Sequence, residues 1–143
     1  MSVDKPLHLL FVCVGNSCRS QMAEGLARAL GGGGVRASSA GAVPAEMVAP
    51  KAVQVMEELG IDISSQQPKL VTGELVDAAD AVFIMGCDAR SVCPAAFLER
   101  AVDWELEDPM GQGVERYREV RDLIRRHIED LLREEGMEPA PLG

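Results

Sequence analysis

A nearly continuous apolar run at residues 7–12, Leu-His-Leu-Leu-Phe-Val, constrains the fold more than any other feature. Such a run is typical of a strand that is buried on both faces, as in a parallel sheet. Apolar residues at helical spacing follow it, from Met22 to Leu30, and the glycines at 31–34 end that helix. A strand that leads into a helix is the repeating unit of an α/β protein.

The same alternation continues to the end of the chain. The further elements that we expect are strands at 35–39, 81–85 and 101–106, a helix that begins at Pro50 and ends at Gly60, a short helix or turn at 70–79, and a long amphipathic helix at 114–131. The last residues, 138–143, are expected to be frayed. The sequence therefore predicts an α/β fold: one domain over residues 1–143, with a four-stranded parallel sheet flanked by helices in three layers.

The charge balance restricts the partners of the chain. Its 143 residues include 14 Lys and Arg against 23 Asp and Glu, which gives a net charge of −9. An acidic chain is poorly suited to nucleic acid or to an anionic membrane, so we expect neither as a partner. We find no export signal, and no apolar stretch comes near the roughly 18 residues of a membrane span, so we expect a cytoplasmic protein. We also expect a monomer.

The segment 13–20, Cys-Val-Gly-Asn-Ser-Cys-Arg-Ser, lies between the first strand and its helix. Such a loop turns backbone N–H groups inward and forms a cradle for a tetrahedral oxyanion at the helix N-terminus. Arg19 adds a planar cationic fork, Ser20 can donate its hydroxyl to the Cys13 thiolate, and Cys13 can attack the bound anion. The residues expected to bind the oxyanion are Val14, Gly15, Asn16, Ser17, Cys18 and Arg19. No Lys follows, so this is not a nucleotide-binding loop.

Three reactive side chains follow the first, third and fourth expected strands: Cys13, Cys87 and Asp108. Because ligands bind at the carboxyl ends of parallel strands, we expect all three on one rim. Cys93 follows Cys87 after five residues. A phosphatase needs no such pair, whereas a reductase must supply two electrons, and a dithiol can do so. Two other interpretations stay open: a pair of inert buried cysteines, or a zinc site of four cysteines, although the spacings are loose for zinc.

The segment 13–24 resembles the active-site loop of thioredoxin-coupled arsenate reductases, which share the fold of low-molecular-weight protein tyrosine phosphatases. The phosphatases usually have Ile in place of Ser17 and Pro in place of Gln21. The resemblance covers nearly the whole chain and includes Ser39-Ala40-Gly41, Pro50-Lys51-Ala52, Gly60 to Ser64, and Trp104 to Pro109. It implies the same phosphatase-like fold and a role in arsenic detoxification.

The resemblance implies a relay of three thiols. Cys13 attacks arsenate, Asp108 protonates the departing oxygen, and Cys87 then attacks the Cys13 sulfur so that arsenite leaves. Cys93 attacks Cys87, and thioredoxin reduces the resulting Cys87–Cys93 disulfide; glutaredoxin with glutathione could do the same. Related reductases often have six residues between the last two cysteines, where this chain has five. Cys18 does not match a redox thiol, so we expect it to pack.

The resemblance also bears on cofactors. Asn16, Glu24 and Ser39 match positions that hold potassium in some members, but Gln67 and Lys69 stand where Thr and Asp ligands are expected. Since a lysine in place of a cation ligand can supply the positive charge itself, we expect no potassium, no other metal and no tightly bound cofactor.

The remaining polar residues near these motifs receive simpler interpretations. Pro109 is expected to stiffen the segment that presents Asp108. The other residues that we considered are Glu105 and Glu107, expected to be solvated charges, and His8 and His127, expected to be structural.

Two rival functions remain at this stage. The first is a phosphatase acting on phosphotyrosine or small phosphoesters; Cys87, Cys93 and an aromatic content of 3% argue against it, although weak activity on an aryl phosphate is expected. The second is a non-catalytic sensor of oxyanions or redox state, which would not need Asp108. For either enzyme, phosphate and sulfate would mimic the arsenate anion.

Overall fold

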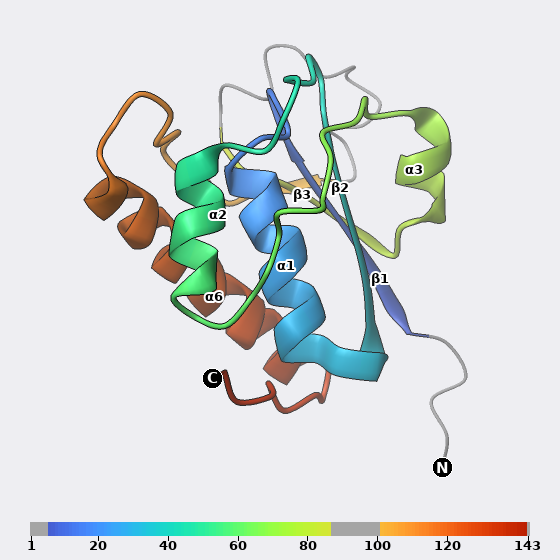
Figure 1. Ribbon diagram of the computed structural model, residues 1–143. Helices are drawn as coiled ribbons and strands as arrows, with labels where there is room; N and C mark the ends of the chain where they lie inside the picture. Colours follow the sequence, from blue (N-terminus) through green and yellow to red (C-terminus); the bar gives the residue numbers. More distant parts are fainter. Residues whose placement is uncertain (1–5, 87–100, 143) are drawn as a thin grey trace.

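The computed structural model describes residues 6–86 and 101–142 (Figure 1). Its sheet contains the strands β1 (Leu7–Cys13), β2 (Val35–Gly41), β3 (Ala81–Ile84) and β4 (Ala101–Asp103). Its α-helices are α1 (Arg19–Gly31), α2 (Pro50–Glu57), α3 (Gly73–Ala78) and α6 (Val114–Glu134). All strand pairs are parallel, in the order β2-β1-β3-β4. The predicted α/β fold with a four-stranded parallel sheet is thus confirmed.

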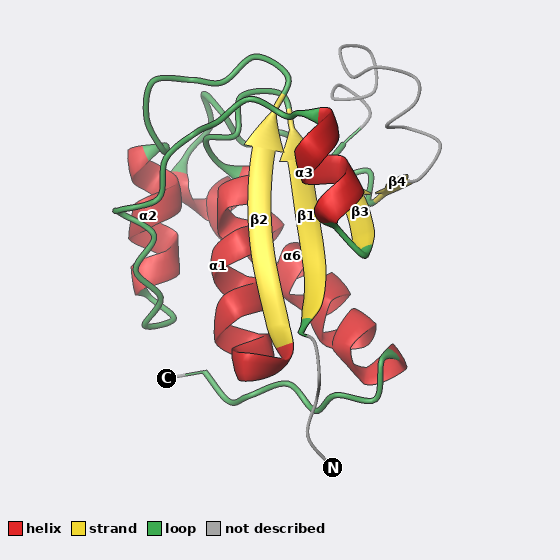
Figure 2. Ribbon diagram, turned by 90° about the vertical axis from the view of Figure 1, so that its right-hand side faces the viewer, coloured by secondary structure: helices red, strands yellow, loops and turns green. Residues whose placement is uncertain are grey.

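The strand β1 lies in the middle of the sheet and is buried on both faces, as its apolar run predicts. On one face, Leu9 and Phe11 belong to the larger core, which α1, α2 and α6 cover. On the other face, Leu10 and Val12 belong to a smaller core, which α3 covers. The strands end at the side of the molecule opposite both chain termini (Figure 2).

The structure corrects several element boundaries. β2 extends to Gly41, because it pairs with β1 along the whole length of that strand, from Leu7 beside Val35 to Cys13 beside Gly41. β4 ends at Asp103 rather than at residue 106, because Glu105 adopts a positive φ of 53° that extended backbone does not allow. The first helix begins three residues earlier than its apolar pattern, at Arg19.

The expected helical segments in the middle of the chain are also shorter. α2 starts at Pro50, as predicted, and Gly60 follows it in the left-handed region with φ 77°. Within the segment 70–79, α3 begins at Gly73, since the Thr72 hydroxyl caps it by accepting a hydrogen bond from the Leu75 amide (3.2 Å).

The tail is not frayed, contrary to expectation. The Ala140 amide donates to the Leu30 carbonyl at the end of α1 (2.8 Å), and Leu142 packs against the larger core. In the part of the chain that the structure describes, no helix is long and apolar enough to cross a membrane.

Candidate active site

The loop between β1 and α1 is fixed through its backbone carbonyls. Those of Cys13, Val14, Gly15 and Ser17 accept hydrogen bonds from the amides of Ala42, Val43, Ala45 and Ala49, at 3.3, 2.9, 2.9 and 2.8 Å. The Asn16 carbonyl accepts from the Gln21 side chain (2.9 Å), and the Cys18 carbonyl accepts from Met22 (2.9 Å). Every carbonyl from Cys13 to Cys18 is therefore bonded within the protein.

This pattern determines where the loop amides point. In a trans peptide the N–H group points opposite to the carbonyl of the same peptide unit, and the described chain contains no cis peptide. The N–H groups of residues 14–19 share peptide units with the carbonyls of residues 13–18. They therefore point away from the groups that donate hydrogen bonds to those carbonyls. Such an arrangement supports the predicted oxyanion cradle.

Gly41, at the end of β2, allows the loop to approach the sheet. A Cβ atom at this position would lie 2.6 Å from the Val14 oxygen and 2.8 Å from the Asn16 nitrogen, and both are backbone atoms that cannot rotate away. Only glycine fits this contact.

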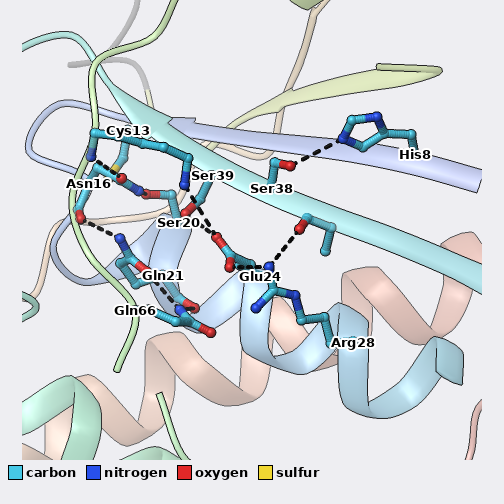
Figure 3. A network of polar contacts seen from close by, with 12 residues as sticks. His8, Cys13, Asn16, Ser20, Gln21, Glu24, Arg28, Ser38, Ser39 and Gln66 are labelled. Atoms are coloured by element: carbon cyan, nitrogen blue, oxygen red, sulfur yellow. Dashed lines mark hydrogen bonds and ion pairs between the residues drawn. The ribbon is translucent and has the colours of Figure 1, made fainter. Parts of the chain in front are cut away.

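The Cys13 thiol lies at the base of the loop, with 2% of its surface exposed, and its sulfur is 2.8 Å from the Ser20 hydroxyl oxygen (Figure 3). The Asn16 side chain favours Ser20 as the donor in that hydrogen bond. Its Nδ2 donates to the same Ser20 oxygen (2.8 Å), and its Oδ1 accepts from the Lys69 amide (2.9 Å). Since Ser20 accepts from Asn16, its own hydrogen is available to donate to the Cys13 sulfur.

Two glutamines support Asn16, which is fully buried and has a positive φ of 51°. Gln21 donates to the Asn16 carbonyl (2.9 Å), and Gln66 Nε2 in turn donates to the Gln21 side-chain oxygen (2.6 Å) (Figure 3). The sequence drew attention to Gln21 only as a departure from the phosphatase pattern, and no motif indicated Gln66.

Arg19 is 1% exposed and connects the loop to the far half of the sheet. Its Nη1 donates to the Leu106 carbonyl (3.1 Å) and to the Met85 carbonyl (3.4 Å). Its Nη2 lies 3.6 Å from Asp108 Oδ2. The structure thus brings Asp108 to the loop that carries Cys13, Arg19 and Ser20; Cys87, expected on the same rim, lies outside the described residues.

Cys18 does more than pack. Its thiol is buried, as expected, but it also donates to Asp108 Oδ1 (3.6 Å). Burial, with the neighbouring Cys13 and Asp108, raises the pKa of the Cys18 thiol to about 12.

Tyr117 of α6 lies in the same region, a placement that sequence reasoning missed. Burial raises the pKa of Tyr117, and the charges of Cys18 and Asp108 add to this effect. Tyr117 lies within the amphipathic helix expected at 114–131, and no motif marked it, although it is the single tyrosine of the chain.

The residues that match a cation site are joined to one another by hydrogen bonds and ion pairs. The buried Glu24 accepts from the Ser39 hydroxyl (2.6 Å) and pairs with Arg28 (2.7 Å) (Figure 3). The Lys69 ammonium lies 4.0 Å from the Glu24 carboxylate. The side-chain oxygen of Asn16 already accepts a hydrogen bond from the Lys69 amide. Within residues 6–86 and 101–142, no three His, Cys, Asp or Glu side chains form a metal-binding group.

The two histidines lie within the fold and not in the loop. His8, at the opposite end of β1 from Cys13, contacts the Ser38 hydroxyl (3.1 Å) and the Ala78 carbonyl (3.0 Å). His127 stacks on Trp104 (4.6 Å between ring centroids), and burial lowers the pKa of His127.

The two glutamates beside the acid differ from one another. Both glutamates are exposed, as expected, and Glu107 also forms an ion pair with Arg116 of α6.

Cys87 and Cys93 lie outside the described residues. The chain that leads toward them passes beside the loop, because the Met85 amide donates to the Val12 carbonyl (2.8 Å). Cys87 is the second residue after Met85 in the sequence.

Comparisons with known proteins agree with this geometry. The family model for low molecular weight phosphotyrosine protein phosphatase matches residues 8–138. The chain is 41% identical over 125 residues to the glutaredoxin arsenate reductase of Synechocystis sp., covering 87% of this chain and 95% of that protein. It is 38% identical over 124 residues to an arsenate reductase of Staphylococcus xylosus, covering 86% and 94%. A solved arsenate reductase in the phosphate binding state has a TM-score of 0.81 at 39% identity, covering 90% of this chain and 98% of that one.

Proposed function

The chain belongs to the low molecular weight phosphotyrosine protein phosphatase family, and we propose that within this family it is an arsenate reductase. One observation carries the chemistry: the Cys13 sulfur lies 2.8 Å from a serine hydroxyl, at the base of a loop whose carbonyls are all bonded elsewhere. Cys87 and Cys93, together with relatives named arsenate reductase, favour reduction over hydrolysis.

The first step forms a covalent adduct. Arsenate binds to the amides of residues 14–19 and to the Arg19 guanidinium, with Cys13 below it. The Cys13 thiolate attacks arsenic, the As–O bond on the opposite side breaks, and Asp108 gives its proton to the departing oxygen, which leaves as water. The contact between Arg19 Nη2 and Asp108 Oδ2 (3.6 Å) supports this assignment of the acid.

The second step transfers the electrons. The Cys87 thiolate attacks the Cys13 sulfur, the sulfur–arsenic bond breaks, and its electron pair stays on arsenic, which leaves as arsenite. A Cys13–Cys87 disulfide remains. The Cys93 thiolate then attacks the Cys87 sulfur, which frees Cys13 and leaves a Cys87–Cys93 disulfide.

An external dithiol must reduce the Cys87–Cys93 disulfide, and we propose thioredoxin as that reductant. Glutaredoxin with glutathione is the alternative, because the Synechocystis relative bears the name glutaredoxin arsenate reductase. The deciding assay is arsenate-dependent oxidation of NADPH, with thioredoxin and its reductase in one arm and glutaredoxin, glutathione and its reductase in the other. Phosphate in place of arsenate is the control and should give no oxidation. No signal in either arm excludes the reductase.

The relay makes a separate prediction for Cys93. A Cys93→Ser variant should complete one turnover and then stop with a Cys13–Cys87 disulfide, which mass spectrometry of the alkylated protein would detect. Repeated turnover by this variant is incompatible with a relay through Cys93.

The role of Asp108 separates the enzyme from a non-catalytic sensor. Asp108→Asn should lower arsenate turnover by about 10²- to 10⁴-fold, the usual contribution of a general acid. Glu105→Gln, which changes an exposed carboxylate of the same segment, is the matched control and should be close to wild type. Equal activity of the two variants would favour a sensor.

Hydrolysis of phosphoesters is a second candidate activity, favoured by the family to which the chain belongs. The loop would bind a phosphoryl group as it binds arsenate, so we expect slow hydrolysis of p-nitrophenyl phosphate. A rate constant for hydrolysis above that for arsenate reduction would make the chain a phosphatase.

We propose that catalysis needs no potassium ion. Arg28 and Lys69 already supply positive charge to Glu24, as its 2.7 and 4.0 Å contacts support. Exchanging sodium for potassium at constant ionic strength should leave kcat/KM unchanged. A saturable increase with potassium contradicts this proposal.

We further propose that the chain acts as a single-domain monomer in the cytoplasm, without nucleic acid or membrane as a partner. The net charge of −9 supports the exclusion of both polyanionic surfaces. Light scattering coupled to size-exclusion chromatography tests the oligomeric state.

A further inference from the structure

The two carboxyl oxygens of Asp108 have different surroundings. Oδ1 accepts from the Met110 amide (3.0 Å) and from the Cys18 thiol (3.6 Å). Oδ2 lies 3.6 Å from Nη2 of the Arg19 guanidinium. One oxygen is therefore held by two neutral donors, and the other faces the group that would bind the anion.

The Cys18 thiol is suited to act as a donor. The pKa of about 12 that burial and its neighbours give it keeps the thiol protonated at neutral pH. Its backbone is fixed on both sides, because the Ser17 carbonyl accepts from Ala49 and the Cys18 carbonyl accepts from Met22. The Sγ–H group therefore reaches Asp108, 90 residues away in sequence, from a rigid position.

A carboxylate on an exposed segment needs such an anchor. The Asp108 side chain is 42% exposed, and rotation of a carboxylate about its last bond is only weakly restricted. The Met110 amide belongs to the same turn as Asp108 and moves with it, whereas Cys18 belongs to the loop that holds the anion. Cys18, unlike Met110, therefore relates the orientation of the acid to the position of the substrate, and it does so through the oxygen that does not face Arg19.

We infer that Cys18 is a positioning residue for Asp108: its thiol holds Oδ1, so that Oδ2 carries and delivers the proton. This inference rests on the proposed function of Asp108 as general acid. Oδ1 already accepts two hydrogen bonds, so in the proposed step Oδ2 carries the proton. There it lies on the side of Arg19 and of the departing arsenate oxygen.

Two variants separate this role from packing. Cys18→Ala removes the donor, and Cys18→Ser keeps one while it places a more polar group in a buried site. If Cys18 positions the acid, Cys18→Ala should lower kcat for arsenate reduction by about tenfold, a part of the contribution of a general acid, with KM little changed. Cys18→Ser should retain more activity than Cys18→Ala. If Cys18 only packs, Cys18→Ala should retain more activity than Cys18→Ser, and that result would overturn the inference.

A double-mutant cycle tests whether the effect passes through the acid. In an Asp108→Asn background, Cys18→Ala should have little further effect on kcat, because the proton donor is already lost. If the losses of kcat from Cys18→Ala and from Asp108→Asn are independent and add, Cys18 does not act through Asp108, and the inference is overturned.

A measurement without turnover keeps the test separate from the proposed function. The carboxyl ¹³C resonance of Asp108, assigned by its loss in Asp108→Asn, should move in Cys18→Ala and stay nearer to its wild-type position in Cys18→Ser. The Asp122 resonance, from a carboxylate paired with Arg121 on α6, is the control and should not move in either variant. An unmoved Asp108 resonance in Cys18→Ala refutes the anchor even if the protein reduces no arsenate. A moved resonance supports the anchor in that same case.

Discussion

At the scale of single residues, the cradle depends on contacts that tolerate no added atom. Gly41→Ala should disrupt the loop, because its Cβ would lie 2.6 Å from the Val14 oxygen and 2.8 Å from the Asn16 nitrogen. We expect a loss of about 1–3 kcal/mol in the free energy of unfolding, as for other overpacked sites, together with weaker phosphate binding. Urea denaturation and calorimetric titration with phosphate measure the two effects.

Gly33→Ala is the matched control for this substitution, because no atom lies within 4 Å of its added Cβ. It should be close to wild type in both measurements. Equal behaviour of the two variants would show that the loop can move away from β2.

The direction of one hydrogen bond is a second property of this scale. Asn16→Asp replaces the amide that donates to Ser20 by a carboxylate that can only accept. The Ser20 hydrogen should then turn toward the new carboxylate, a charge-assisted bond, and away from the Cys13 sulfur. We expect kcat/KM for arsenate to fall by about tenfold or more, the effect of one hydrogen bond to a charged group. Ser20→Ala removes the same donor and should give a similar loss; a fully active Asn16→Asp variant contradicts the assigned direction.

At the scale of elements, an ion-pair network joins α2 to α6. The Glu58 carboxylate accepts from Arg118 (2.7 and 3.0 Å) and from Arg121 (2.7 Å). These hydrogen bonds, with Arg118 the larger contributor, lower the pKa of Glu58 from 4.5 to about 2. The charged form is thus favoured in the folded state. The network therefore stabilises the protein fully above pH 4.5 and loses its effect as the pH falls toward about 2.

Glu58→Gln should accordingly be less stable than wild type at pH 7, and the difference should shrink as the pH falls from 4.5 toward about 2. Urea denaturation across this range gives the free energies. Glu134→Gln, which changes an exposed carboxylate at the end of α6, is the control and should show no such trend. A constant difference between Glu58→Gln and wild type at all pH values is inconsistent with the network.

Local patterns explain what could be predicted at this scale. The apolar run of β1, Pro50 at the start of α2 and the stepped apolar residues of α6 each depend on neighbours in sequence, and all three predictions were right. The early end of β4 depends on the positive φ of Glu105, and the packed tail depends on Leu30, far away in the chain. Neither leaves a local signal.

The same distinction holds for the site. The loop residues 13–20 are contiguous, so their chemistry could be predicted from one segment. Gln66 supports Gln21 from 45 residues away, and Cys18 contacts Asp108 from 90 residues away. Such contacts are created by the fold and have no motif in a single sequence.

At the scale of the whole molecule, anion binding should stabilise the fold. At a phosphate concentration about 100 times Kd, the free energy of unfolding should rise by about 2.7 kcal/mol, because the ligand binds only the folded state. Arg19→Lys keeps the charge but loses the planar fork, so phosphate should raise its Tm less. Arg125→Lys, on the outer side of α6, is the matched control and should respond as wild type does. A phosphate effect that is equal in all three proteins would locate the anion elsewhere.

The contacts of Arg19 also order events in time. Its acceptors are the carbonyls of Met85 and Leu106, and the acid beside it is Asp108. A ribosome makes Cys13 long before it makes these groups. A nascent chain therefore carries the thiol without a fixed guanidinium beside it. On the proposed function, Cys13 can react with arsenate only after most of the chain has been synthesised and the sheet has formed.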